Sequence, residues 1–157
     1  MLRAIKITEE QPHFYYKRVA ENEETRKKTS EIFGCVYSHS YNGDIYVFPK
    51  DVYLDDERTP ARGWFVVRTT EEMIGLLREY KGFIRAISLD HDLGTEKTGY
   101  DVLLWIEEQV AINGYVPPEI FIHTGNTSAE IKMKLAVKKI KELARKNEEK
   151  NAGITAS

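Results

Sequence analysis

Two stretches of the chain share one design, in which a short apolar run passes directly into acidic residues: VYLDDERTP at residues 52–60 and ISLDHDLG at residues 87–94. Each apolar run has the length and composition of a buried strand, and the second begins at about Ile84. Similar runs occur at residues 64–67 and 120–122, and helical patterns separate most of the runs. This alternation predicts a parallel, right-handed α/β core with a three-layer architecture.

Capping signals mark the helices that we expect between and after these strands. Thr69 followed by Glu72 is a capping box for the first helix, and Thr127 followed by Glu130 is one for the last. The regular apolar stripe of the last helix fades at Lys146. The expected helices cover residues 69–80, 100–113 and 127–146.

A β-hairpin is expected before the core, because Asn42-Gly43 accepts the positive φ angles of a type I′ turn between residues 36–41 and 44–48. A length of 157 residues with 41% hydrophobic content indicates one domain. We expect three parts within this domain: an N-terminal extension with the hairpin at residues 1–50, the α/β core at 51–146 and a frayed tail at 147–157.

The sequence also bears on the compartment. It has no apolar run of about 18 residues and no signal-peptide stretch at its N-terminus, which predicts a soluble, cytoplasmic protein without a membrane partner. The single cysteine, Cys35, excludes an internal disulfide and predicts no disulfide-linked partner.

Charge is distributed unevenly along the chain. Residues 51–126 hold 7 basic and 14 acidic side chains, whereas residues 127–157 hold 8 basic and 4 acidic ones. The acidic middle suits a metal site better than a broad nucleic-acid surface. The basic end is either a solvated helix face or a surface that touches a phosphate backbone.

The acidic residues after the strands form the first candidate site. Asp55 and Asp56 follow the first core strand directly, and Asp90 follows the third. A strand order of 2-1-3-4 places all of them at the switch point of the sheet, where ligands of open α/β sheets bind. Crowded carboxylates repel one another unless a divalent cation lies between them, so we expect Mg²⁺ or Mn²⁺. The alternative is that both motifs are polar turns.

Two histidines are expected at the same edge. His91 stands between Asp90 and Asp92, and His123 ends the fourth strand. An imidazole there serves as a metal ligand, a general base or a general acid, and the carboxylates around His91 favour its protonated form and an acid role. The alternative for each is a structural, hydrogen-bonded histidine.

A phosphate group has two candidate contacts. Thr124, Gly125 and Asn126 precede a helix N-terminus, whose free N–H groups and dipole attract anions, although capping alone explains these residue types. Arg58 either makes a forked contact to phosphate or pairs with a neighbouring carboxylate, Asp56 or Glu57.

With these residues in place, residues 51–126 resemble the cyclic-phosphate processing receiver domain family. The resemblance rests on four motifs: residues 54–60 (LDDERTP), 89–94 (LDHDLG), 99–101 (GYD) and 122–126 (IHTGN). It implies a flavodoxin-like sheet, an acidic metal pocket and the processing of cyclic phosphates at nucleotide or RNA ends. The loop at residues 57–63 is too short for a full first crossover helix, and no fifth strand ending in the usual lysine follows Asn126.

The leading functional prediction is a metal-dependent phosphoesterase acting on a phosphate-containing small molecule or an RNA end. Its expected metal ligands are Asp55, Asp56 and Asp90. His91 and His123 exchange protons with water and the leaving alkoxide, while Asp92 orients His91 or binds the metal through water. The alternative is a non-enzymatic receiver-like module whose acidic pocket is vestigial or accepts a phosphoryl group on Asp90. A structural or interaction protein is a third interpretation.

Overall fold

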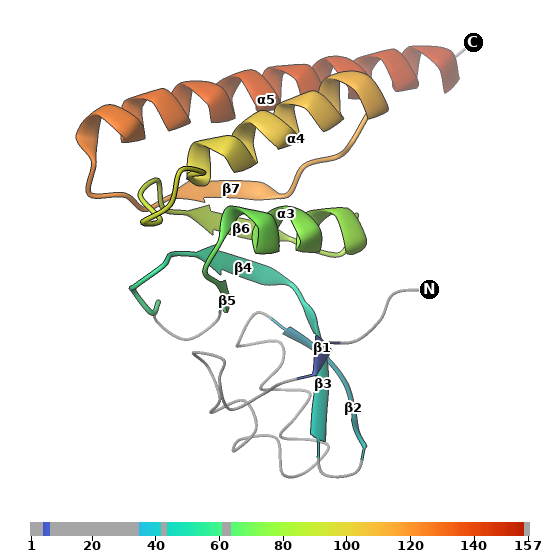
Figure 1. The fold of residues 1–157 in the computed structure, drawn as a ribbon. Coiled ribbons are helices and arrows are strands. Elements are labelled where there is room, and N and C mark those ends of the chain that lie inside the picture. The colour runs from blue at the N-terminus through green and yellow to red at the C-terminus, as the bar shows by residue number, and fades with distance from the viewer. Residues whose placement is uncertain (1–4, 7–34, 42–43, 61–63, 156–157) are drawn as a thin grey trace.

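The computed structural model describes residues 5–6, 35–41, 44–60 and 64–155. Two sheets are present among these residues, an antiparallel one in the N-terminal region and a parallel one in the rest of the chain (Figure 1). The antiparallel sheet has the order β1-β3-β2, and its strands are β1 (Ile5–Lys6), β2 (Cys35–Tyr41) and β3 (Asp44–Pro49).

The register of β2 and β3 brings Tyr41 opposite Asp44. The residues between them, Asn42 and Gly43, lie outside the described part of the chain, so the hairpin turn stays a prediction.

The parallel sheet has the order β5-β4-β6-β7, which confirms the predicted order 2-1-3-4. Its strands are β4 (Asp51–Leu54), β5 (Phe65–Val67), β6 (Ala86–Leu89) and β7 (Glu119–Ile122). Leu54 pairs with Leu89, and Leu89 pairs with Ile122, so the central strands end in line. The residues that follow these strands therefore share one edge of the sheet.

Three helices accompany the sheet: α3 (Thr70–Glu79), α4 (Gly99–Asn113) and α5 (Thr127–Thr155). Thr69 caps α3 as predicted, by accepting a hydrogen bond from the Glu72 N–H. Thr98 and Asp101 form a reciprocal capping box at α4 that the sequence analysis missed. None of the helices in the described part of the chain is long and apolar enough to cross a lipid bilayer.

The capping box predicted for α5 at Thr127 and Glu130 is wrong, because Asn126 is the capping residue. Its Oδ1 accepts a hydrogen bond from the Ala129 N–H at 3.1 Å. Thr127 is already the first helical residue. Asparagine is a better helix cap than threonine, and from position 126 its side chain reaches the N–H of Ala129, the third residue of the helix.

The end of α5 also differs from the prediction, since the helix continues past Lys146 to Thr155. Asn147 Nδ2 donates to the carbonyl oxygen of Val110 at 2.9 Å, which ties this part of α5 to the end of α4. Arg145 and Glu149 add an i,i+4 ion pair on the exposed side. These polar contacts extend the helix where the apolar stripe has ended.

The core lies on one face of the parallel sheet. Val52, Leu54, Ile87, Leu89 and Ile120 point to this face and join a single buried cluster with apolar residues of all three helices. Figure 1 shows α4 and α5 side by side above β7. The alternate strand residues, among them Tyr53 and Phe121, are outside this cluster.

The described residues therefore form two layers, where the sequence predicted three. Right-handed crossovers that run along the sheet in one direction place their helices on the same face. The crossover from β4 to β5 is the one that runs in the other direction, and it holds no described helix.

Candidate functional site

The carboxyl edge of the parallel sheet brings three aspartates together as predicted. Hydrogen bonds continue beyond the strands, from the Asp90 N–H to the Leu54 carbonyl oxygen at 3.0 Å and from the Asp55 N–H to the Val67 carbonyl oxygen at 3.2 Å. One carboxylate oxygen each of Asp55, Asp56 and Asp90 lies within 4.8 Å of the others. Asp55 is 1% exposed and Asp90 is 6% exposed. The backbone ladder thus fixes where these carboxylates converge.

Asp55 is the most heavily hydrogen-bonded of the three. Its Oδ1 accepts from the N–H groups of Glu57 at 3.0 Å and Arg58 at 2.7 Å, and its Oδ2 accepts from Arg58 Nε at 3.0 Å. Burial alone would raise the pKa of Asp55, but the backbone N–H groups and the Arg58 charge outweigh it and lower that pKa. Asp55 is therefore an ionised carboxylate whose charge the protein already balances in part.

Asp56 and Asp90 keep oxygens available for a ligand. Asp90 Oδ1 accepts from the His91 N–H at 2.8 Å and lies 3.6 Å from an Arg58 terminal nitrogen, while no hydrogen bond within the described residues involves Oδ2. The Asp56 carboxylate accepts none from the described residues either. Gly94, at φ 67, lies so close that a Cβ there would be 3.3 Å from Asp56 Oδ2. Two oxygen-rich groups pointing at one place fit a hard cation such as Mg²⁺.

A pocket of about 630 Å³ opens over these aspartates. It is lined by Asp55, Asp56, Glu57, Arg58, Asp90, Asp92, Gly94, Gly125 and Asn126. The structure thus joins most of the predicted metal-binding and phosphate-binding residues in one cavity. His91, His123 and Thr124 belong to the same edge but do not line it.

Arg58 links the acidic residues to the end of β7. Besides Asp55 and Asp90, its guanidinium contacts the His123 carbonyl oxygen at 3.3 Å. Of the two roles considered for Arg58, the pairing with Asp56 or Glu57 is therefore wrong, because Asp55 accepts hydrogen bonds from both the guanidinium and the N–H of Arg58. The forked contact to phosphate stays a prediction. Arg68, which the sequence analysis missed, donates to the carbonyl oxygens of both Asp55 and Arg58 at 2.8 Å and so secures this loop.

His123 is held by the protein at both ring nitrogens and on one face of its ring. Its Nε2 lies 3.2 Å from Asp55 Oδ2, its Nδ1 lies 2.6 Å from Ser88 Oγ, and the ring stacks on Tyr53 at a centroid distance of 3.9 Å. Burial lowers the pKa of His123 although Asp55 acts in the opposite sense, which favours the neutral ring. Because an ionised carboxylate only accepts, Nε2 carries the hydrogen and Nδ1 accepts from Ser88.

The sequence analysis missed Ser88 and Tyr53, although their positions held a signal. Both alternate with core residues along their strands, so both side chains emerge on the sheet face opposite the helices. His123 follows β7 on that side, and the register of β4, β6 and β7 brings the three together.

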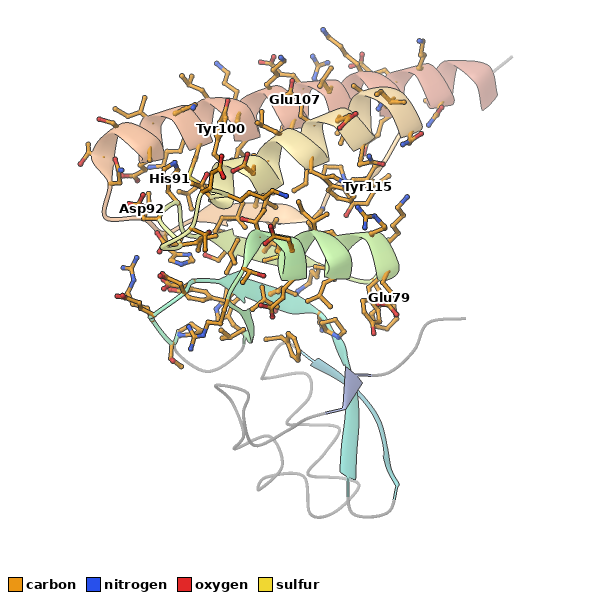
Figure 2. All side chains as sticks on the ribbon, viewed as in Figure 1. Glu79, His91, Asp92, Tyr100, Glu107 and Tyr115 are labelled. Atoms are coloured by element: carbon orange, nitrogen blue, oxygen red, sulfur yellow. The ribbon has the colours of Figure 1, made fainter. Side chains whose placement is uncertain are left out.

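His91 and Asp92 form a separate pair in the loop before α4 (Figure 2). His91 Nδ1 lies 2.8 Å from Asp92 Oδ1, and this hydrogen bond is the main cause that lowers the pKa of Asp92. Asn126 Nδ2 reaches Asp92 Oδ2 at 3.5 Å, so the pair is adjacent to the start of α5. His91 Nε2 has no hydrogen-bond partner among the described residues.

The predicted phosphate contacts lie at the N-terminus of α5. Gly125 and Asn126 line the pocket, whereas Thr124 accepts a hydrogen bond from the Asn126 N–H at 3.2 Å. The Asn126 side chain makes two contacts: its Oδ1 caps the helix, and its Nδ2 donates to Asp92.

A parallel sheet of order 2-1-3-4 with three aspartates at its carboxyl edge defines a receiver-like domain. The family described as cyclic-phosphate processing receiver domain matches residues 50–139, which is more than half of the chain. The protein belongs to this family, as the motifs of its sequence indicated. No curated protein and no solved structure shows a significant match.

Proposed function

We propose that this protein is a metal-dependent phosphoesterase that opens a cyclic phosphate on a nucleotide or an RNA end. The observation that carries the proposal is the convergence of Asp55, Asp56 and Asp90 within 4.8 Å, in a pocket that also contains Arg58 and the start of α5. Carboxylates, a guanidinium and a helix N-terminus together suit a cation and a phosphate bound side by side.

Mg²⁺ or Mn²⁺ is the cofactor of this proposal, held by Asp55, Asp56 and Asp90. When bound, it supplies a Lewis acid that polarises a phosphoryl oxygen. Arg58 contacts Asp55 and Asp90 but is 56% exposed, which leaves its guanidinium accessible to a phosphate oxygen from the solvent side. The backbone N–H groups around Gly125 and Asn126 provide the second phosphate contact, because the dipole of α5 favours an anion there.

His91 is the proton donor and acceptor that the contacts favour. In opening a cyclic phosphate, the water oxygen forms a new P–O bond as one ring P–O bond breaks, the water loses a proton and the leaving alkoxide gains one. Asp92 holds His91 Nδ1, which fixes the ring and leaves Nε2 for the exchange. In this proposal Asp92 acts through His91.

His123 is the second candidate for proton transfer. Its Nε2 and Nδ1 are both engaged, by Asp55 and Ser88, so one of these hydrogen bonds must break before His123 exchanges a proton with the substrate. This geometry favours a positioning role for His123, in which the ring holds Asp55 in place.

The test is a panel of 2′,3′-cyclic nucleotides, cyclic dinucleotides and phosphomonoesters, each assayed with and without Mg²⁺ or Mn²⁺. We expect metal-dependent turnover of a cyclic phosphate, and His91→Ala to lower it by about 10²–10⁴-fold, the usual contribution of a positioned acid or base. His39→Ala is the matched control, because it removes an imidazole from β2 in the other sheet. The absence of turnover across the panel in folded, metal-loaded protein would refute the proposal.

His123→Ala separates the two histidines. A positioning role predicts that this variant weakens metal binding together with turnover, since Asp55 loses a partner. A loss of turnover with unchanged metal binding would instead assign the proton transfer to His123.

The alternative is a receiver-like signalling module in which Asp90 accepts a phosphoryl group. This alternative is favoured by Asp90, which lines the pocket and whose Oδ2 takes part in no hydrogen bond within the described residues. Against it, no lysine lines the pocket within the described residues, so the usual cationic partner of a phosphorylated aspartate is missing.

A further inference from the structure

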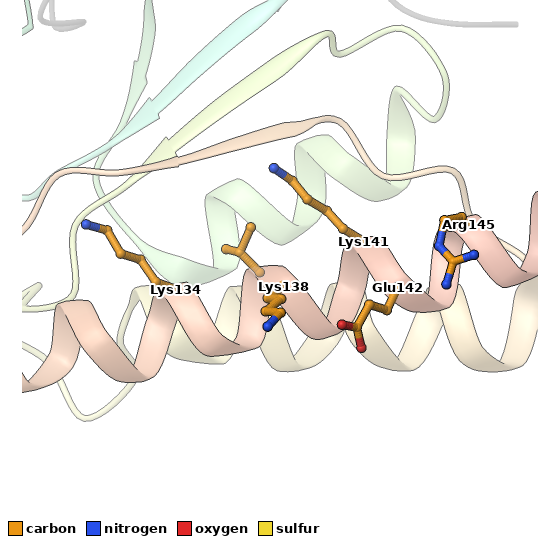
Figure 3. Close-up of a pocket in the computed structure, with 6 residues that line it drawn as sticks. Lys134, Lys138, Lys141, Glu142 and Arg145 are labelled. Atoms are coloured by element: carbon orange, nitrogen blue, oxygen red, sulfur yellow. The ribbon is translucent and has the colours of Figure 1, made fainter.

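A second, smaller cavity runs along α5, outside the acidic pocket. It has a volume of about 350 Å³ and is lined by Lys134, Val137, Lys138, Lys141, Glu142 and Arg145. Figure 3 shows these side chains on successive turns of α5. Four cations and one carboxylate make this groove strongly positive, in a chain whose net charge is −2. We call it the basic groove.

The basic groove is aligned with the acidic pocket. Its residues recur every three or four positions, so they form one stripe along α5. The same repeat leads back from Lys134 to Glu130 and Thr127, and Thr127 adjoins Asn126 in the pocket wall. At 1.5 Å per residue, the groove begins about 10 Å from Thr127 and extends for about 16 Å. A ligand anchored in the pocket thus passes Glu130, which is paired with Lys134, and then meets a row of cations as it leaves along α5.

The cations in the groove are available to bind an anion. Lys138 and Lys141 form no ion pair within the described residues. Lys134 and Arg145 pair with Glu130 and Glu149 on their own helix, but both pairs are exposed. Exposed pairs of this kind contribute at most about 1 kcal/mol, so a phosphate replaces the carboxylate at little cost.

The charges also indicate which occupant fits. A second copy of α5 would bring like charges face to face, which disfavours a symmetric dimer through this helix. An anionic polymer whose end enters the pocket meets carboxylates whose charge Arg58 balances only in part, so cations along its path supply attraction that the pocket lacks.

We propose that the basic groove binds the phosphate backbone of a single-stranded RNA whose terminus occupies the acidic pocket. This inference rests on the proposed function for the terminus, and it assigns a polymer, in preference to a free mononucleotide, as the substrate. Backbone contacts from lysine and arginine carry no base preference, so the groove is sequence-independent.

The test measures binding without turnover. Fluorescence anisotropy is recorded with a labelled 12-nucleotide oligouridylate that ends in a 3′-hydroxyl, between 50 and 200 mM salt. Release of about 0.7 counterion per contacted phosphate predicts a slope of log affinity against log salt of up to about −3 for four cations. Lys138→Glu and Lys141→Glu should each weaken binding at least about fivefold at 0.1 M salt and flatten the slope by about 0.7.

Lys81→Glu is the matched control, because it makes the same change in net charge at an exposed position after α3. If Lys81→Glu weakens RNA binding as much as the groove variants do, the proposed role of the groove is refuted, since only net charge would then matter. Poly-L-glutamate that competes as well as unlabelled oligouridylate would also overturn it and indicate an acidic protein as the occupant.

The two proposals fail separately. Binding that depends on Lys138 and Lys141, without turnover of any cyclic phosphate, supports the groove and refutes the proposed function. If a cyclic mononucleotide is turned over but RNA binding is unchanged in Lys138→Glu and Lys141→Glu, only the proposed role of the groove is refuted.

Discussion

Gly99→Ala tests how the acidic site is held in place. Gly99 opens α4 directly beneath the loop that carries Asp90. A Cβ added at Gly99 would lie 1.8 Å from the Asp90 carbonyl oxygen, 2.9 Å from the carbonyl carbon and 3.1 Å from Met133 Cε. The two nearest of these atoms belong to the backbone, so a shift of the flexible Met133 side chain alone cannot relieve the clash.

Both sides of this contact are anchored. The Gly99 N–H donates to the His91 carbonyl oxygen at 3.2 Å, and the Asp90 N–H donates to the Leu54 carbonyl oxygen at 3.0 Å. Thr98, just before Gly99, is held by its capping box and by Thr70 Oγ1, which donates to the Thr98 carbonyl oxygen at 2.9 Å. Relief of the clash therefore requires that α4 or the Asp90 loop shift by more than about 1 Å.

Overpacking usually costs about 1–3 kcal/mol, and a backbone clash between anchored segments belongs at or above the upper end of that range. For a chain of this size, 3 kcal/mol corresponds to a fall in Tm of about 6–12 °C. If Gly99→Ala still folds, Mg²⁺ should no longer raise its Tm, because the shift displaces Asp90.

Thermal unfolding followed by circular dichroism, with and without Mg²⁺, measures both effects. Gly75→Ala is the matched control: Gly75 lies within α3, and a Cβ there has no atom within 4 Å. Alanine is the better helix former, so this variant should gain about 0.5–1 kcal/mol, or about 1–4 °C. A Gly99→Ala protein that melts within 2 °C of the original, with its metal response intact, would refute the reasoning.

Three further predictions concern the metal, the phosphoryl acceptor and an alkaline titration. Millimolar Mg²⁺ or Mn²⁺ should raise Tm by about 3–6 °C at ten times the dissociation constant, because binding to the folded state alone then adds about 1.4 kcal/mol. Asp90→Asn should reduce that shift, and unchanged melting with Mg²⁺, Mn²⁺ and Ca²⁺ would contradict the metal site. Acetyl phosphate should not stably phosphorylate Asp90, since the described pocket offers no lysine; intact-mass spectrometry that finds one added phosphoryl group, absent from Asp90→Asn, would promote the signalling alternative. Burial raises the pKa of Tyr115 from 10.0 to about 12, so the folded state retains this proton longer than the unfolded state, and the associated stability is lost as pH rises from about 10 to about 12. Urea unfolding of Tyr115→Phe should show a smaller alkaline decline than the original protein, and an equal decline would assign the loss to other groups.

Local sequence determined the secondary structure and the membership of the acidic cluster. Apolar runs of strand length end at Asp55 and Asp90, and a parallel sheet puts the ends of neighbouring strands at one edge. The sequence predicted the start of α3 correctly, because Thr69 and Glu72 have the spacing of a capping box. The start of α5 at Thr127 was also predicted correctly, but its capping residue was misassigned, because Asn126 and Thr127 are adjacent capping residue types and the choice between them depends on the path of the incoming chain.

Which groups meet across the site was decided by the tertiary structure. The sequence placed His123 at the sheet edge, but its enclosure by Ser88, Tyr53 and Asp55 depends on the register of three strands that are distant in sequence. Similarly, the sequence identified Arg58 as the nearby cation but not its partners. The N–H groups of Glu57 and Arg58 donate to Asp55, and this turn of the loop brings the Arg58 guanidinium to Asp55 and Asp90.

The positions of α4 and α5 against one sheet face, and the alignment of the basic groove with the acidic pocket, were likewise tertiary outcomes. Hydrophobic periodicity and capping are properties of neighbouring residues, so the sequence by itself determined which segments are strands and helices and which carboxylates end them. Hydrogen-bond partners, burial and the direction in which a charged helix face points depend on packing between segments, and that information exists only once the chain has folded.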